Sequence, residues 1–174
     1  TPDGDVVDTD VLIVGSGPAG ASAALFLSTL GVDNVMITKY RWTANTPRAH
    51  ITNQGAMEVF RDLGIDDRVR AAAVPNEYMG NNVWATSFAG REIARLMTWG
   101  SGTARHADYT AASPSAMCNI PQHVLEPIIR AGAEEAGADL RFSTELDEII
   151  QDGDGVTASA CTQPLTAPTT TLRP

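Results

Sequence analysis

The N-terminal part of the chain alternates between unbroken apolar runs and a stretch with helical spacing. Val11 to Val14 form one such run, which is typical of a strand buried on both faces. Apolar residues then recur at helical spacing from Ala21 to Leu30, and Gly31 marks the stop. A second apolar run follows over residues 35–38. A strand, a helix and a strand in this order predict a βαβ unit with a parallel sheet.

Helical spacing returns further along the chain. It predicts a helix over 53–63 that stops at Gly64, and a short helix over 67–73. A longer apolar stripe begins at Leu125, and Gly137 ends it. These stretches add helices to the βαβ unit and keep the chain in the α/β class.

Alternating apolar and polar residues predict further strands. The alternation over 78–98 predicts a β-hairpin or meander inserted between the helical stretches. A strand is expected at 140–142, and a second hairpin over 146–161 with its turn at 152–155. Residues 100–117 are rich in Gly, Ser, Ala and Asp, and they predict a long loop.

The charge balance narrows the range of partners. With 12 basic and 21 acidic residues the net charge is −9, which argues against nucleic acid or an anionic membrane surface. Since no apolar run approaches the roughly 20 residues of a membrane span and the start is polar, we expect neither a membrane span nor a signal peptide. Two cysteines are too few for a disulfide framework, and this favours a cytoplasmic location for the protein. We also expect no metal site.

Three glycines between the first strand and the first helix have the spacing of a dinucleotide-binding turn. Gly15 allows the tight turn, Gly17 lets a pyrophosphate approach the backbone, and Gly20 lets the helix pack against the strand. The helix N-terminus offers free N–H groups and a partial positive charge to phosphates. Because the motif lies between a strand and an Ala-rich helix, we prefer a nucleotide-binding turn to a ligand-free glycine turn.

The end of the second strand departs from the usual nucleotide-binding pattern. NAD- and FAD-binding folds commonly place an Asp or Glu there to hold the ribose hydroxyls. Here Thr38 or Lys39 stands at that place. A hydroxyl or an ammonium group could contact the ribose or its phosphate, but the carboxylate is missing.

Three segments of the sequence, residues 10–23, 42–54 and 117–127, together resemble the group A flavoprotein aromatic hydroxylases, which are FAD-dependent monooxygenases. The nearest likeness is to the phenol hydroxylases and 2,4-dichlorophenol 6-monooxygenases. The middle segment, with Trp42, Arg48 and His50, is the most specific. The resemblance extends over about residues 10–158 and stops after Ala158, which suggests an N-terminal, truncated piece of a hydroxylase.

The resemblance implies a Rossmann-like FAD/NAD(P)-binding fold of the glutathione-reductase type, with an inserted β-hairpin or meander. Residues 1–77 would form the FAD-binding βαβ portion, and 78–117 the inserted hairpin and loop of the substrate region. Residues 118–161 would return to the FAD-binding domain. A Thr- and Pro-rich tail over 162–174 is expected to be irregular.

The resemblance also implies a set of cofactor-binding residues. They are Gly15, Ser16, Gly17, Pro18, Ala19, Gly20, Thr38, Lys39, Arg48, Gln122 and Leu146. The glycine turn would wrap the FAD pyrophosphate, Thr38 and Lys39 would lie beside the adenosine ribose, and Leu146 near the adenine. Arg48 would reach the flavin and its phosphates, and Gln122 the ribityl chain.

His50 is the candidate catalytic residue, because relatives carry a polar residue near the substrate at this position. An imidazole titrates near neutral pH and could accept a phenol proton. The residues themselves also allow purely structural roles for the candidate site residues. Arg48 could form a surface ion pair, Gln122 could be an ordinary residue in the first turn of a helix, and His50 could be bonded to the backbone. His106 and His123 are taken as solvated or structural.

The implied parent is an NAD(P)H-dependent monooxygenase that hydroxylates phenols or chlorophenols at the ortho position through a flavin C4a-hydroperoxide. Its partners would be a small phenolic substrate and O₂, and the parent could be a homo-oligomer. The fragment alone is expected to be inactive. Two alternatives are a non-catalytic, vestigial nucleotide-binding fragment and an NAD-only Rossmann protein, the second of which leaves residues 42–54 and 117–127 unexplained.

Overall fold

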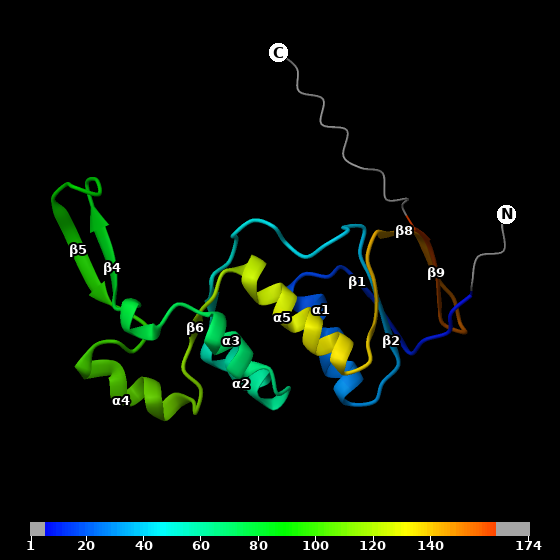
Figure 1. Ribbon diagram of the computed structural model, residues 1–174, viewed down its shortest axis with the longest axis horizontal. Helices are drawn as coiled ribbons and strands as arrows, with labels where there is room; N and C mark the ends of the chain where they lie inside the picture. Colours follow the sequence, from blue (N-terminus) through cyan, green and yellow to red (C-terminus); the bar gives the residue numbers. More distant parts are fainter. Residues whose placement is uncertain (1–5, 163–174) are drawn as a thin grey trace, which may run out of the picture. The chain divides into compact units, whose positions relative to one another are not determined.

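The structure is a computed structural model that describes residues 6–162 (Figure 1). Helices and strands alternate along the chain, which confirms the α/β class. The chain divides into two compact units, one formed before residue 46 and after residue 128, the other by residues 46–128. Helix α5 (Gln122–Glu135) contributes residues to both. Each unit is described by itself.

The first unit contains the expected βαβ arrangement. Strands β1 (Val11–Val14) and β2 (Asn34–Ile37) pair in parallel, and α1 (Pro18–Thr29) connects them. Strand β7 (Asp139–Arg141) pairs in parallel with the other side of β2, giving the order β1-β2-β7. The three strands lie within one residue of their predicted positions, and α1 begins three residues before the predicted start at Ala21.

Burial differs between the strands of this sheet. The central strand β2 is fully buried, and Met36 is 0% exposed. By contrast, β1 is only half-buried and Val14 is exposed, so the expectation of a strand buried on both faces is wrong for β1. The reason is its place at the edge of the described sheet. Leu25 of α1 and Ile129 of α5 complete the apolar core.

A long hairpin follows the sheet, as predicted. Strands β8 (Thr144–Gln151) and β9 (Val156–Thr162) pair antiparallel, with a register shift between Leu146 and Glu148. The Asp152 side chain closes the turn by accepting hydrogen bonds from the Asp154 and Gly155 N–H groups at 2.9 and 3.0 Å.

The second unit begins its helices where the apolar pattern predicts them. Asn53 caps α2 (Gln54–Asp62), its side-chain oxygen accepting from the Ala56 N–H at 2.9 Å. After the turn at Gly64, α3 (Asp66–Ala72) follows. The buried side chains of this helix pair are Met57, Phe60, Ile65 and Val69.

Strands of the second unit form two small antiparallel pairs. Strand β3 (Ile51–Thr52) pairs with β6 (Cys118–Asn119). Strands β4 (Asn81–Ala85) and β5 (Glu92–Met97) form the predicted hairpin, which extends away from α2 and α3 after the short 3-10 helix η1 (Asn76–Tyr78) (Figure 1).

One predicted element is wrong. Instead of a long loop over 100–117, the chain forms helix α4 (Thr103–Ala112). Alanine has the highest intrinsic helix propensity, and Ala107, Ala111 and Ala112 lie within this helix, so alanine should not have been counted as a loop residue. A tertiary contact also holds the helix, because the Gln54 amide donates to the Tyr109 carbonyl at 3.0 Å.

Other expectations meet the limits of the described chain. Residues 163–174, most of the expected irregular tail, lie outside it, and the predicted domain boundaries stay a prediction. No helix within residues 6–162 is long and apolar enough to cross a membrane. The same residues contain no group of three His, Cys, Asp or Glu side chains placed to hold a metal ion.

Candidate functional site

The glycine turn between β1 and α1 gives each glycine a different task. Gly15 has a φ of 111°, and its N–H donates to the Ile37 carbonyl at 2.8 Å. A Cβ on Gly20 would lie 2.0 Å from the Gly15 carbonyl oxygen. The helix can therefore approach the turn this closely only because residue 20 has no side chain. A Cβ on Gly17 would meet nothing within 4 Å. Gly15 and Gly20 are required by the fold, whereas Gly17 leaves open space before the helix.

The start of α1 is suited to an anion. Gly17 is the N-cap and Pro18 follows it, and within the described residues no side chain caps the helix and no acidic residue lies in its first turn. Ser16 is buried, so the turn presents backbone N–H groups and the positive end of the helix dipole. Open space, uncapped N–H groups and the absence of a carboxylate fit a diphosphate.

The residues that follow β2 contact strand β8. Thr38 is 4% exposed, and its hydroxyl accepts from the Tyr40 N–H at 3.4 Å. Lys39 is exposed, and its Nζ lies 3.7 Å from Oε1 of Glu145 on β8. Half-buried Leu146 follows Glu145. A carboxylate, which the sequence lacks directly after β2, therefore lies next to Lys39 from β8, and no local sequence pattern indicates this contact.

A stacked cation fixes the segment after β2. The Arg130 guanidinium lies 4.5 Å from the Trp42 ring centre and 5.1 Å from the Phe142 ring centre. Its Nη2 also lies 2.8 Å from Oε1 of Glu134. A cation–π contact of this kind stabilises the folded state by about 0.5–2 kcal/mol. The exposed Trp42 ring therefore packs against a charge.

In the second unit, the structure brings His50 and Gln122 into one small network, while Arg48 is exposed close by in the chain. The Gln122 N–H donates to the Ala49 carbonyl, and the Ile120 N–H to the His50 carbonyl, both at 2.8 Å. The Gln122 side-chain amide donates to Oε1 of Glu126, which is 3% exposed. Gln122 therefore satisfies a buried carboxylate in its own helix.

His50 has a partner that sequence reasoning missed. Its Nδ1 lies 2.9 Å from Oδ1 of Asn119, and the Asn119 amide nitrogen faces the Met79 sulfur at 2.8 Å. An amide oxygen only accepts, so this contact selects the tautomer with its proton on Nδ1. The exposed ring then presents Nε2 as an acceptor. The β3–β6 pairing sets this contact, and no sequence motif signals it.

Cys118, beside Asn119 on β6, is buried, and burial raises the pKa of its thiol. A raised pKa keeps the thiol protonated and poorly nucleophilic. Cys118 therefore acts as a small core residue.

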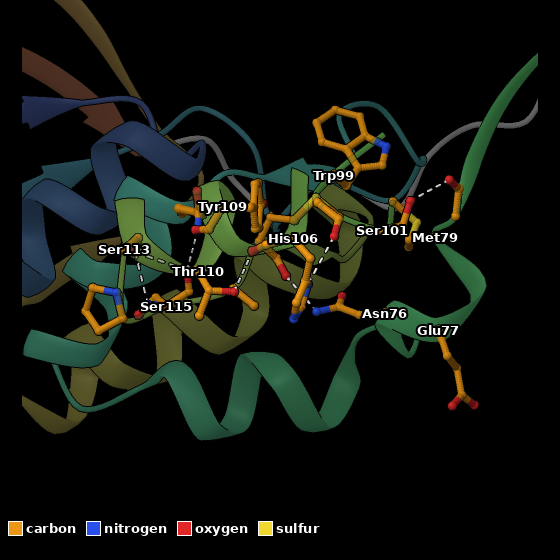
Figure 2. Close-up of a pocket in the computed structure, with 16 residues that line it drawn as sticks. Asn76, Glu77, Met79, Trp99, Ser101, His106, Tyr109, Thr110, Ser113 and Ser115 are labelled. Carbon is orange, nitrogen blue, oxygen red and sulfur yellow. Dashed lines mark hydrogen bonds between the residues drawn. The ribbon is translucent and has the colours of Figure 1, made fainter. Parts of the chain in front are cut away.

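The second unit contains a cavity of about 590 Å³ lined mainly by η1, α4 and residues 113–117. Figure 2 shows the side chains that line it. Side chains tie its walls together. The Gln54 amide donates to the carbonyls of Tyr109 and Ser115 at 3.0 and 3.1 Å, and the Asn76 amide to that of Met117 at 3.2 Å. The sequence missed this cavity because it predicted a loop where α4 forms a wall.

Comparison with known proteins finds a matching family and similar relatives. The family described as FAD binding domain matches residues 8–174, a match that runs beyond Ala158, where we expected the resemblance to stop. Phenol 2-monooxygenase of Pseudomonas sp. (strain EST1001) is 60% identical over 87% of this chain and 25% of its own length. 2,4-Dichlorophenol 6-monooxygenase of Delftia acidovorans is 53% identical over 88% of this chain and 26% of its own length.

A solved structure of a related protein is also similar to this chain. The crystal structure of the flavin-dependent monooxygenase PieE in complex with FAD and substrate is 48% identical, with a TM-score of 0.86, over 92% of this chain and 27% of that one. The chain thus spans about a quarter of the length of the relatives it matches.

Proposed function

Because the chain belongs to the FAD binding domain family, we propose that it is the FAD-binding portion of an NAD(P)H-dependent monooxygenase that hydroxylates phenols or chlorophenols. The observation that supports this most directly is the glycine turn, with open space at Gly17 in front of an uncapped helix N-terminus. The identities to a phenol and a dichlorophenol monooxygenase support the choice of substrate class.

The first unit would hold the adenosine diphosphate part of FAD. The backbone N–H groups of residues 16, 17, 19 and 20 would bind the pyrophosphate, as helix N-termini bind phosphates generally. Pro18 has no N–H to donate. Lys39 and Glu145, paired at 3.7 Å, would lie beside the ribose, and Leu146 would contact the adenine. The Thr38 side chain is buried, and its backbone N–H and carbonyl are hydrogen-bonded to Arg141 and Thr144, so its contact with the ribose stays a prediction.

The second unit would contribute a proton acceptor. When bound, FAD supplies the oxygen-transfer chemistry, with NAD(P)H and O₂ as co-substrates. His50 Nε2 would accept the phenol proton, because a phenolate ring is a stronger nucleophile at its ortho carbon than the neutral phenol. Asn119 acts as a positioning residue that keeps the proton on Nδ1. Arg48 and Gln122 stay predictions as flavin contacts.

Titration of the 174-residue chain with FAD, followed by flavin fluorescence, tests the cofactor site. We expect saturable binding that Gly17→Val weakens at least tenfold, because the new side chain fills the space before the helix. Gly153→Val is the matched control, since it also meets open space but lies in the β8–β9 turn. Equal FAD affinity of wild type and Gly17→Val would contradict the site. No binding by the wild-type chain would favour a vestigial fragment.

The role of Asn119 has its own test. ¹⁵N NMR of the imidazole nitrogens reports the neutral His50 tautomer directly. We expect the Nδ1–H form to dominate in the wild-type chain and the two forms to become mixed in Asn119→Ala, while the His123 signals stay unchanged. An Nε2–H form in the wild-type chain would remove the proposed acceptor. Phenol-stimulated NADPH oxidation by the full-length parent then tests the reaction itself.

A further inference from the structure

We propose that Glu126 is a positioning residue that fixes the side-chain amide of Gln122, so that this point of the candidate site accepts a hydrogen bond and does not donate one. The proposal rests on the proposed FAD-binding function, because it assigns the ligand group that Gln122 would meet. That group is a hydrogen-bond donor, such as a ribityl hydroxyl, rather than a phosphate or carbonyl oxygen. The assignment follows from the backbone of Gln122, the burial of Glu126 and the chemistry of an amide.

The backbone of Gln122 is held in place at the first residue of α5. Its N–H donates to the Ala49 carbonyl at 2.8 Å. Two residues earlier, the Ile120 N–H donates to the His50 carbonyl at the same distance. The start of the helix is therefore fixed against the segment that contains His50, and only the side-chain torsions of Gln122 remain to be determined.

The side chains of Gln122 and Glu126 meet one turn apart on α5. In an α-helix, residues four positions apart are neighbours on the same face. The Gln122 Nε2 donates to Oε1 of Glu126 at 2.5 Å, and Glu126 is 3% exposed. A buried carboxylate is costly unless N–H or O–H groups donate to it, and such charge-assisted hydrogen bonds are stronger than neutral ones. Glu126 therefore holds the nitrogen end of the amide towards itself.

An amide has two different ends, and only one of them suits a carboxylate. Nε2 donates and Oε1 only accepts, so a reversed amide would place two acceptors against each other and remove a donor from the buried carboxylate. Gln122 is half-buried, and no donor among residues 6–162 is bonded to its Oε1. This oxygen is therefore available to a ligand as an acceptor. A hydroxyl group can donate to it, whereas a phosphate oxygen cannot.

The orientation of the amide can be measured by NMR on the 174-residue chain with no flavin present. The two Nε2 proton signals of Gln122 would be assigned with Gln122→Ala. In the wild-type chain, one of them should exchange with water at least tenfold more slowly than the side-chain protons of the exposed Gln151, because it is bonded to a buried carboxylate. Glu126→Met keeps an unbranched side chain but removes the carboxylate, so it should abolish this protection.

A double-mutant cycle on FAD affinity separates positioning from a merely structural role. Glu126→Met should weaken FAD binding about fivefold more when Gln122 is present than in the Gln122→Ala background, because it acts through that amide. Glu134→Met is the matched control in the same helix, since Glu134 is paired with Arg130 instead. It should change neither the exchange of the Gln122 protons nor the affinity for FAD.

The outcomes for Glu126 are distinct from those for the cofactor site. Fast exchange of both Gln122 Nε2 protons in the wild-type chain would overturn the proposal, whether or not Glu126→Met folds. Equal effects of Glu126→Met on FAD affinity in the two backgrounds would overturn it as well. Failure of the wild-type chain to bind FAD would overturn the proposed function, whereas proton exchange decides by itself whether Glu126 holds the amide.

Discussion

Residues 11–38 and residues 98–117 build their sites in opposite ways. In the first region the site is made of backbone, and the glycines that shape it lie within a few positions of one another. Gly20 lets α1 approach Gly15, and the Gly15 N–H bonds to Ile37. In the second region the cavity wall is held by side chains from elsewhere in the chain, Gln54 and Glu58 among them.

This difference explains which site a sequence can reveal. A backbone site requires residues without side chains at fixed spacing, so its glycines can be found by inspection. A side-chain site requires only that distant residues meet, and no local spacing records that. The experiments below test whether the first region depends on local residues and the second on distant ones. They measure how substitutions in each region change stability and hydrogen exchange.

The largest effect is expected at the close approach of α1 and β1. Gly20→Ala places a Cβ 2.0 Å from the Gly15 carbonyl, and we expect a loss of about 3 kcal/mol in the free energy of unfolding. Gly55→Ala in α2 is the control, because its Cβ meets only Asn53 Oδ1 at 3.7 Å. It should leave stability unchanged or raise it by up to about 1 kcal/mol. Urea denaturation measures both, and equal stability of the two variants would contradict the packing.

The next effect is expected at the side chain that ties α4 to α2. Gln54→Ala removes the donor to two carbonyls, Tyr109 and Ser115, which should cost about 2 kcal/mol. Hydrogen exchange should show faster exchange in 103–117 and unchanged protection in β1 and β2. Gln151→Ala, at the exposed end of β8, should change neither. Unchanged exchange in α4 would mean that this helix does not need the contact.

A smaller effect is expected where the first unit also relies on a side chain. Arg130→Met keeps the aliphatic stem but removes the charge between Trp42 and Phe142, which should cost about 1 kcal/mol. Arg105→Met serves as the control, because its side chain is 82% exposed and its pair with Asp108 is long, at 3.8 Å. It should change the unfolding free energy by less than about 0.5 kcal/mol. Thermal unfolding compares the two variants.

The smallest effect is expected on the β4–β5 hairpin. The Arg95 hydrogen bond lowers the pKa of Glu92. A carboxyl group whose pKa is lower in the folded state stabilises the fold above its unfolded pKa, and this contribution disappears as the pH falls through the folded value. Because both side chains of the pair are exposed to solvent, Glu92→Gln should lower the melting temperature only slightly at pH 7. That difference should vanish at a pH below the folded pKa; a difference that grows on acidification would contradict the sign.

Sequence reasoning located most of the first unit and the α2–α3 helix pair of the second unit, because short-range patterns determine both. The strand–turn–helix unit of residues 11–37, the caps at Asn53 and Gly64, and the β8–β9 turn all depend on neighbours in the chain. The same reasoning failed at residues 103–112, where alanines were read as loop residues. It also could not find the Asn119 partner of His50, which is one strand pairing away in space and 69 residues away in sequence.

The amino-acid sequence by itself determined the glycine turn, because only residues without a Cβ allow the positive φ of Gly15 and the close approach at Gly20. Tertiary structure alone decided that Glu145 reaches the end of β2, that Asn119 selects the His50 tautomer, and that α4 encloses a cavity. The physical reason is that backbone conformation depends on neighbouring residues, whereas the distance between side chains depends on how the whole chain folds.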